Sequence, residues 1–144
     1  MNDTERLVAI DAIKQLRSRY LRLLDTKQWD EMVTLYTTDA TLRFETEAPG
    51  MVFRGREGIL EMVSTSLVDV ISVHHGHMAE IEFQSPDKAS GVWALEDILW
   101  FGPDSRAPGK RIHSFGHLKD IYARFGGRWL IKEVAITRLR VDQT

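Results

Sequence analysis

Residues 72–101, SVHHGHMAEIEFQSPDKASGVWALEDILWF, form the stretch that decides the fold. Two strand-like runs are joined here by the turn Ser85-Pro86-Asp87-Lys88, which predicts an antiparallel hairpin. Burying a carboxylate without a partner is costly, so Asp97 needs a partner, and the three histidines of the first run are the nearest source. Asp97 is expected to be buried because alternation on the second run places it on an otherwise apolar face. The other residues of this face are Trp93, Leu95, Leu99 and Phe101.

The rest of the C-terminal half continues this pattern. Strand-like runs cover residues 71–84, 88–101, 111–125 and 128–141. The Gly126-Gly127 pair between the last two runs is a strong signal for a two-residue hairpin turn. We therefore predict an antiparallel meander. The loop over residues 102–109 is rich in turn residues and could cover the mouth of a pocket.

The N-terminal half predicts helices. Asp3 or Thr4 can cap a long amphipathic helix that ends near residues 25–27, a short helix covers 29–36, and a third covers 55–69. Residues 40–44 and 51–54 between them predict a small hairpin. Early helices and a late sheet define an α+β domain, in which the sheet curls around the first and third helices and leaves a cavity.

The composition limits the function classes. The 144 residues carry a net charge of -2, which gives no electrostatic reason to expect nucleic acid or an anionic membrane as partner. Cysteine is absent, which excludes disulfides, thiolate metal sites and a cysteine nucleophile. The polar, acidic first residues do not resemble a secretory signal, and no apolar run reaches membrane-spanning length. We expect a single cytoplasmic domain over residues 1–144.

Two blocks of sequence carry a family resemblance. The first is Ala12-Ile13-Lys14-x-Leu16-x-x-x-Tyr20-x-Arg22-x-Leu24-Asp25-x-Lys27-x-Trp29-Asp30-Glu31. The second is Ile71-Ser72-x-His74-x-Gly76-His77-x-x-Glu80-Ile81 with Ala89-x-Gly91-x-Trp93-x-Leu95-Glu96-Asp97-x-Leu99. On these residues the chain resembles the SnoaL-like group, and most closely the bile acid 7α-dehydratases within it. The resemblance covers nearly the whole chain and implies the cone-shaped α+β barrel that scytalone dehydratase, ketosteroid isomerase and nuclear transport factor proteins share.

The resemblance also implies a catalytic set. A tyrosine, an aspartate five residues later, a histidine on the first long strand and an aspartate on the second fall on Tyr20, Asp25, His74 and Asp97. A further pocket tyrosine of the family falls on Phe44, which removes a hydroxyl from the site. The dehydratases need no metal, so the resemblance implies neither metal nor cofactor, and it implies a homo-oligomer, a trimer or a dimer.

Considered from the residues alone, Tyr20 and Asp25 on the first predicted helix are also open to simpler interpretations. Tyr20 lies on the buried stripe of the first helix, where a packed core tyrosine is the ordinary finding. Asp25 could be an ordinary acid at the end of a helix. Five helical positions correspond to about 500°, so Tyr20 and Asp25 share a face only if the helix ends or bends between them.

The three clustered histidines are also open to more than one interpretation. Alternation groups His75 and His77 with Ile81 and Phe83, so His74 reaches a pocket only through a bulge or twist, for which Gly76 is a plausible site. From the residues alone, His75 or His77 is favoured as the histidine that faces the pocket. A metal site is the competing interpretation, with His75 and His77, or His113 and His117, as two ligands and Asp97 as the third.

The candidate substrate contacts come from several elements. His113 and His117 share the face of Phe115 and are candidates to line the pocket, and Arg138 matches an arginine of the family's last strand, where it would bind substrate or an oligomer partner. A surface salt bridge is the alternative for Arg138. The full set of candidates is Phe44, His77, Trp93, His113, His117 and Arg138.

These observations predict a cofactor-independent dehydratase that acts on a hydrophobic cyclic or steroid-like hydroxy-carbonyl compound. His74, oriented by Asp25, would remove a proton, Tyr20 would donate to the oxygen that gains negative charge, and Asp97 would tune the histidine or assist hydroxyl departure. The alternatives are an isomerase or polyketide-cyclase-like enzyme and a binding module without activity. The sequence leaves open whether the substrate arrives as a coenzyme A thioester.

Overall fold

Six strands form one sheet that carries most of the chain. The computed structural model describes residues 1–144 and orders the strands β2-β1-β6-β5-β4-β3. The predicted α+β class and the antiparallel meander are confirmed. The meander consists of β3 (Val70–Ser85), β4 (Lys88–Phe101), β5 (Arg111–Phe125) and β6 (Arg128–Gln143). Beyond β6, β1 (Tyr36–Phe44) pairs in parallel, and the two-residue β2 (Phe53–Arg54) pairs antiparallel with β1.

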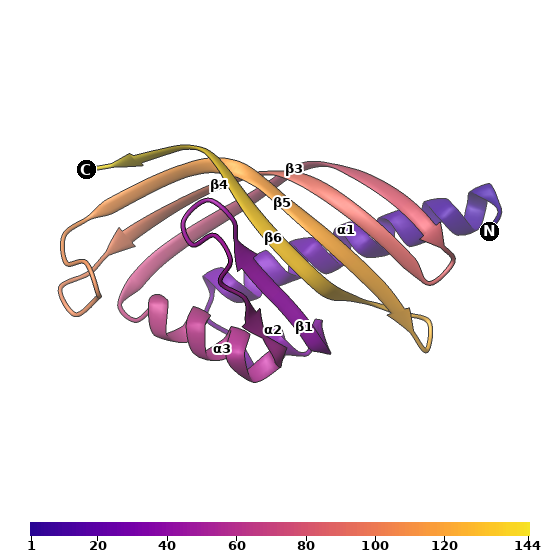
Figure 1. Ribbon diagram of the computed structural model, residues 1–144, viewed down its shortest axis with the longest axis horizontal. Helices are drawn as coiled ribbons and strands as arrows, with labels where there is room; N and C mark the ends of the chain where they lie inside the picture. Colours follow the sequence, from indigo (N-terminus) through magenta and orange to yellow (C-terminus); the bar gives the residue numbers. More distant parts are fainter.

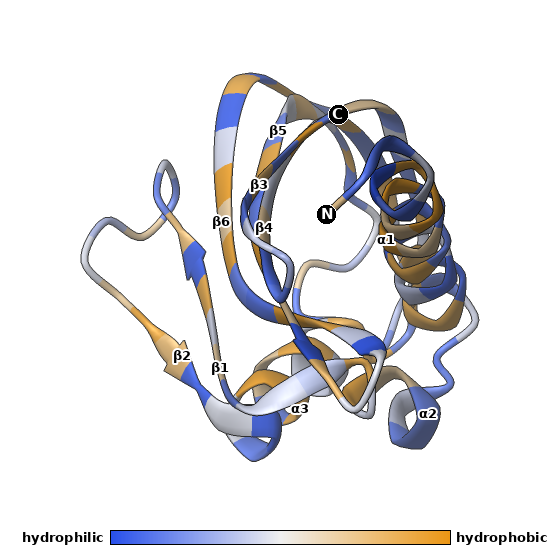
Figure 2. Ribbon diagram, turned by 90° about the vertical axis from the view of Figure 1, so that its right-hand side faces the viewer, coloured by the Kyte–Doolittle hydropathy of each residue, from blue (hydrophilic) through white to orange (hydrophobic).

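Three helices lie against the sheet. They are α1 (Asp3–Asp25), α2 (Trp29–Val33) and α3 (Gly55–Ser66). Helix α1 contacts β3 and β6, while α3 contacts β1 and β2. Figure 1 shows the long strands arching over the helices, and Figure 2 shows the same strands bent into an arc that faces α1. None of the three helices has the length and apolar character that crossing a bilayer requires.

Helix α1 begins one residue earlier than the sequence suggested. The Asn2 side chain accepts from the Glu5 backbone N–H at 2.8 Å, and the Glu5 carboxylate accepts from the Asn2 N–H at 2.9 Å. This capping box satisfies two free donors of the first turn, so Asn2 and not Asp3 or Thr4 is the cap. The helix runs without interruption to Asp25. Its buried face includes Ile13 and Tyr20.

Two predicted boundaries are wrong. Helix α2 ends at Val33, and Tyr36 begins a strand because it pairs with Ile131 of β6 and is fully buried there. Helix α3 ends at Ser66 rather than near Asp69, which has a positive φ of 53°. In both places tertiary contacts override the local apolar spacing.

A β-bulge in β3 decides which histidine faces inward. The pairing shifts between His77 and Glu80, where β3 has one residue more than β4, and Met78 in this segment has a φ of 29°. Before the bulge, His74 lies opposite Asp97; after it, Ile81 and Phe83 pack against the core. One extra residue reverses the alternation, so inward-facing His74 and a buried Phe83 are compatible. The bulge that was expected near Gly76 therefore lies just beyond it.

A second irregularity brings β6 close to β5. Gly116 pairs with Arg138 and Phe115 with Arg140, so Leu139 is the extra residue of a bulge. A Cβ on Gly116 would lie 1.8 Å from the backbone oxygen of Thr137, which only a glycine permits. The turn predicted at Gly126-Gly127 is present, and both glycines have positive φ values of 57° and 77°.

Candidate active site

A cavity of about 530 Å³ opens between the sheet and the helices. Most of its wall is apolar, and a small number of polar side chains enter it, as in most small-molecule sites. The apolar wall includes Leu21, Leu24, Leu42, Phe44, Phe53, Met62, Val63, Leu95, Leu99, Ile112, Leu118, Val134 and Ile136. The polar side chains include Arg17, Tyr20, Tyr36, His74, Asp97, Ser114 and Arg138. Three of the four predicted catalytic residues therefore lie in the cavity wall, and Phe44 and Arg138 of the predicted contacts lie there too.

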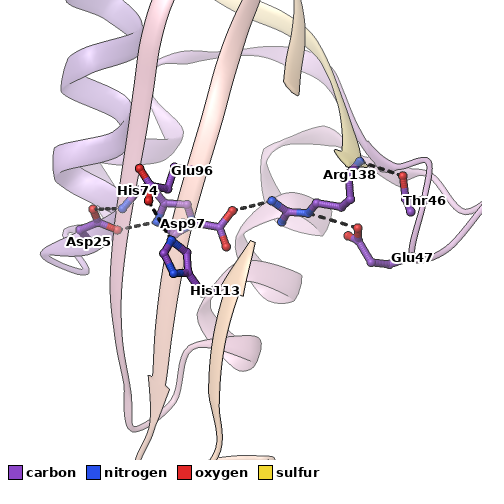
Figure 3. A network of polar contacts seen from close by, with 8 residues as sticks. All are labelled: Asp25, Thr46, Glu47, His74, Glu96, Asp97, His113 and Arg138. Carbon is purple, nitrogen blue, oxygen red and sulfur yellow. Dashed lines mark hydrogen bonds and ion pairs between the residues drawn. The ribbon is translucent and has the colours of Figure 1, made fainter. Parts of the chain in front are cut away.

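His74 is fixed by the fourth predicted catalytic residue, Asp25. The distance from His74 Nδ1 to Asp25 Oδ1 is 2.6 Å (Figure 3). The His74 backbone N–H donates to Asp25 Oδ2 at 2.8 Å, and the Ser72 hydroxyl donates to Oδ1 at 2.9 Å. Because a carboxylate only accepts, Nδ1 carries the proton and the lone pair is left on Nε2. His74 is thus held in the tautomer that a general base requires.

Asp25 supports His74 from outside the cavity. It lines a shallow surface depression with His75 and His77 rather than the main cavity. Because α1 continues unbroken to Asp25, Tyr20 and Asp25 lie on different faces of the helix, as five helical positions require. Asp25 therefore contacts His74 without lining the main cavity.

Tyr20 offers a hydroxyl group to the cavity. The Tyr36 hydroxyl donates to the Tyr20 oxygen at 2.8 Å, and the two rings pack edge to face with centroids 5.2 Å apart. This contact leaves the Tyr20 proton free for another acceptor. Burial raises the pKa of Tyr20 above its usual value. Tyr20 therefore remains a neutral hydrogen-bond donor at physiological pH.

Asp97 has an arginine partner, not a histidine. Arg138 Nη1 lies 2.5 Å from Asp97 Oδ2, and the Asp97 side chain is only 2% exposed. Arg138 also contacts the loop after β1, with its Nε 3.2 Å from Glu47 Oε1 and its backbone N–H donating to Thr46 Oγ1 at 2.9 Å (Figure 3). The expectation that the histidine strand supplies the partner is wrong. His74 is the cross-strand neighbour of Asp97, but its ring nitrogen is committed to Asp25.

A buried polar chain underlies the cavity. Arg17 donates to both oxygens of Asp120, through Nε at 2.9 Å and Nη2 at 2.6 Å, and lies over the ring of Tyr20 with its Cζ 5.0 Å from the centroid. Burial alone lowers the pKa of the Arg17 guanidinium, but the adjacent Asp120 carboxylate more than offsets this, and the pKa is raised. The Tyr122 hydroxyl donates to Asp120 at 2.6 Å and accepts from Trp93 Nε1 at 2.9 Å. Trp93 is thus part of this core network and not of the cavity wall.

The other predicted histidines lie outside the cavity. His77 pairs with Ala94, which pairs with His117, on the face opposite Leu95, and His113 follows the same alternation. The cavity wall on β5 is formed instead by Ile112, Ser114 and Leu118. His113 and His117 are therefore corrected from the pocket side to the outer face of the sheet. Asp97 faces inward, so neither histidine pair can share a metal ion with it.

Several cavity residues were not identified from the sequence. Arg17 lies one helical turn before Tyr20 on the same buried stripe, a spacing that could have identified it. Tyr36 was assigned to a helix, which hid its role. Arg106, in the loop expected to cover a pocket mouth, is exposed at the cavity, where its Nε lies 3.4 Å from the Ser66 carbonyl.

Comparison with known proteins places this geometry in a family. Gamma-hexachlorocyclohexane dehydrochlorinase of Sphingobium indicum is 30% identical over 104 residues, which cover 71% of this chain and 63% of that protein. The chain thus spans slightly under two thirds of the length of the curated relatives it matches. Hexachlorocyclohexane dehydrochlorinase 1 of Sphingobium indicum is likewise 30% identical, over 71% of this chain and 64% of that protein. Both names denote lyases.

Solved structures share the same fold. A hexachlorocyclohexane dehydrochlorinase, LinA type 2, superposes with a TM-score of 0.85 at 21% identity, covering 99% of this chain and 93% of that one. A scytalone dehydratase-like protein of Novosphingobium aromaticivorans gives a TM-score of 0.85 at 19% identity, covering 98% and 91%. The SnoaL-like domain model matches residues 5–135. Because this match covers most of the 144 residues, the chain belongs to the SnoaL-like domain family.

Proposed function

We propose that the protein is a cofactor-independent lyase that removes water from a hydrophobic cyclic hydroxy-carbonyl compound. One observation carries the proposal: His74, with Nδ1 held by Asp25 at 2.6 Å, lines a largely apolar cavity of about 530 Å³. Nε2 has no protein partner in the structure and is the atom available to accept a proton. The lyase names of the curated relatives support elimination as the reaction class.

The proposed reaction begins with proton abstraction next to a carbonyl group. His74 Nε2 takes a proton from the carbon α to the carbonyl, and the electron pair of that C–H bond moves toward the carbonyl oxygen. Tyr20, a neutral donor whose own proton is not used by Tyr36, hydrogen-bonds to the oxygen as negative charge develops. The carboxylate of Asp25 stabilises the imidazolium that forms.

Elimination then expels the hydroxyl group from the β carbon. The electron pair returns to form the carbon–carbon double bond, the C–O bond breaks, and the proton held on His74 passes to the leaving oxygen, so the products are an alkene and water. Arg138 lines the cavity and, paired with Asp97, can donate to that oxygen as it departs. No oxidant and no net proton from solvent are needed.

The substrate class follows from the cavity wall. Leucine, isoleucine, valine and phenylalanine side chains surround the polar groups, which favours a rigid apolar ring system with few oxygens. The positions that resemble the bile acid 7α-dehydratase set, Tyr20, Asp25, His74 and Asp97, support a steroid-like skeleton. Phe44 in place of the family tyrosine leaves one fewer hydrogen-bond donor, so we propose a substrate with one polar substituent fewer at that end.

Turnover of cyclic β-hydroxy ketones, steroids first, tests the proposal. The expected product has lost one water by mass, and His74→Gln lowers kcat by about 10²–10⁴. Asp25→Asn, which keeps an acceptor but disturbs the tautomer, lowers kcat more than it changes KM. His117→Gln, on the outer face, is the matched control and leaves turnover unchanged.

Three outcomes would contradict the proposal. Full activity in His74→Gln would exclude the histidine as the base. A product of unchanged mass would indicate an isomerase instead. Tight binding of such ligands without turnover, under conditions in which the protein is folded, would indicate a binding module.

A further inference from the structure

Three histidines and a glutamate gather on the outer face of the sheet, on the side away from the cavity. His75 and His77 lie two residues apart on β3, Glu96 pairs with His75 from β4, and His113 reaches Glu96 from β5. The side chains of His75 and His77 are 56% and 53% exposed. None of the four lines the cavity. We call these residues the outer-face cluster.

The two carboxylate oxygens of Glu96 have different partners. His113 Nε2 lies 2.8 Å from Oε2 (Figure 3), while His77 Nε2 lies 3.4 Å and His75 Nδ1 3.9 Å from Oε1. Glu96 is therefore an oriented carboxylate with Oε1 directed to the two exposed imidazoles.

The geometry points to a divalent metal site: we propose that His75 Nδ1, His77 Nε2 and Glu96 Oε1 bind a transition-metal ion such as Zn²⁺. One ligand atom from each of the three residues lies within 4.8 Å of the other two. With metal–ligand distances of about 2.0–2.2 Å, two ligands of a tetrahedral ion are separated by about 3.4 Å, so small rotamer changes suffice. Imidazole and carboxylate ligands suit zinc, nickel and copper better than calcium or magnesium.

His113 orients the Glu96 carboxylate of this site without itself being a proposed ligand. By donating to Oε2 it fixes the carboxylate plane and leaves Oε1 for the ion, as outer-shell partners of metal ligands commonly do. Three protein ligands leave a fourth position for water or for a group from another molecule. The ring of His113 is itself held against Phe115, with centroids 4.5 Å apart.

The site is separate from the proposed lyase chemistry but lies on the same two strands. His74 and Asp97 face the cavity at paired positions, and their chain neighbours His75 and Glu96 face outward at the next pair. A bound ion would therefore link β3 to β4 directly behind the residues that line the cavity. The proposal does not depend on the proposed function, because no group of the outer-face cluster contacts the cavity.

Isothermal titration with ZnCl₂ on the full chain, purified without a histidine tag and treated with a chelator, tests the site. We expect one Zn²⁺ per chain. His75→Ala and His77→Ala each weaken binding by at least tenfold, and His113→Ala weakens it by about 10–100-fold. His117→Ala, which removes a histidine from the same face but outside the cluster, is the control and leaves affinity unchanged.

The results that would overturn the proposal are distinct from those that bear on catalysis. No binding of Zn²⁺ by the folded protein would exclude the site. Equal affinity in wild type and His77→Ala would place the ion elsewhere. An equal loss in His117→Ala would show nonspecific binding to surface histidines. Because the side chains of His75 and His77 are exposed, replacing them removes no core contact, and circular dichroism checks that each variant is folded.

Discussion

Replacing Asp120 by asparagine should strongly destabilise the protein. Asp120 and Arg17 form a buried ion pair, with side chains that are 0% and 1% exposed. Asparagine keeps an acceptor for the Tyr122 hydroxyl, which now donates to Asp120 at 2.6 Å. It removes the negative charge, however, and leaves the Arg17 guanidinium as an uncompensated buried cation.

The size of the effect follows from this geometry. Removing one partner of a fully buried ion pair typically costs about 3–5 kcal/mol. At about 2.1 cal/mol/K per residue, the unfolding entropy of a chain of 144 residues is near 0.3 kcal/mol/K. The midpoint of thermal unfolding should therefore fall by about 10–16 °C. This loss of unfolding free energy lies at the upper end for a single substitution because two hydrogen bonds from Arg17 to Asp120, at 2.9 and 2.6 Å, change together.

Thermal and urea unfolding followed by circular dichroism measure the loss. The double variant Arg17→Met with Asp120→Asn is the control, because it removes the unpaired cation and should recover about 2 kcal/mol or more. A loss below about 1 kcal/mol for Asp120→Asn would refute the reasoning. So would a double variant as unstable as the single one, since the cost would then not come from the isolated charge.

Two further predictions concern the β5–β6 region. Gly116→Ala should destabilise the fold by about 1–3 kcal/mol in urea unfolding, because the new Cβ would lie 1.8 Å from the Thr137 oxygen. The control is Gly58→Ala in α3, whose new Cβ meets nothing within 4 Å and should not destabilise the fold. Equal effects of the two substitutions would contradict this prediction. Arg138→Met should cost about 3–5 kcal/mol because Asp97 loses its partner inside the protein, and adding Asp97→Asn should restore part of the loss. No recovery in that double variant would show that packing, not charge, sets the cost.

The elements with strong periodicity could be predicted from the sequence. The long first helix, the four long strands and the Gly126-Gly127 turn were found because their signals are local. Tyr36 was missed because its strand is defined by parallel pairing with β6, about a hundred residues later in the chain. The mixed character of the sheet has the same non-local origin.

Face assignment on β5 failed for a physical reason. The inward face of this strand mixes the apolar Ile112, Leu118 and Tyr122 with Ser114, Gly116 and Asp120, and so it is not uniformly apolar in the sequence. Ser114 lines the cavity, Gly116 permits the close approach of β6, and Asp120 balances Arg17. The outward face carries Phe115 and resembled a core face. Alternation identifies faces only where burial and polarity agree.

The partner of Asp97 could not be predicted for a related reason. Alternation showed that the carboxylate is buried, and the structure agrees, but Arg138 lies two strands away on β6 and reaches Asp97 across β5. A bulge at Leu139 sets the direction of that arginine. No glycine or proline stands beside Leu139 to indicate this bulge in the sequence.

The bulge at Met78 reverses which residues of β3 face the inner side of the sheet. Upstream of it, even-numbered residues such as His74 face the inner side of the sheet, and downstream of it odd-numbered residues such as Ile81 and Phe83 do. The Met78 side chain is 93% exposed, so truncating it would remove no core contact. Deleting the whole residue, however, would leave β3 with a single alternation along its length. Either Phe83 would turn to solvent or His75 would replace His74 in the cavity wall. A surface position with no chemistry of its own thus specifies which histidine the cavity receives.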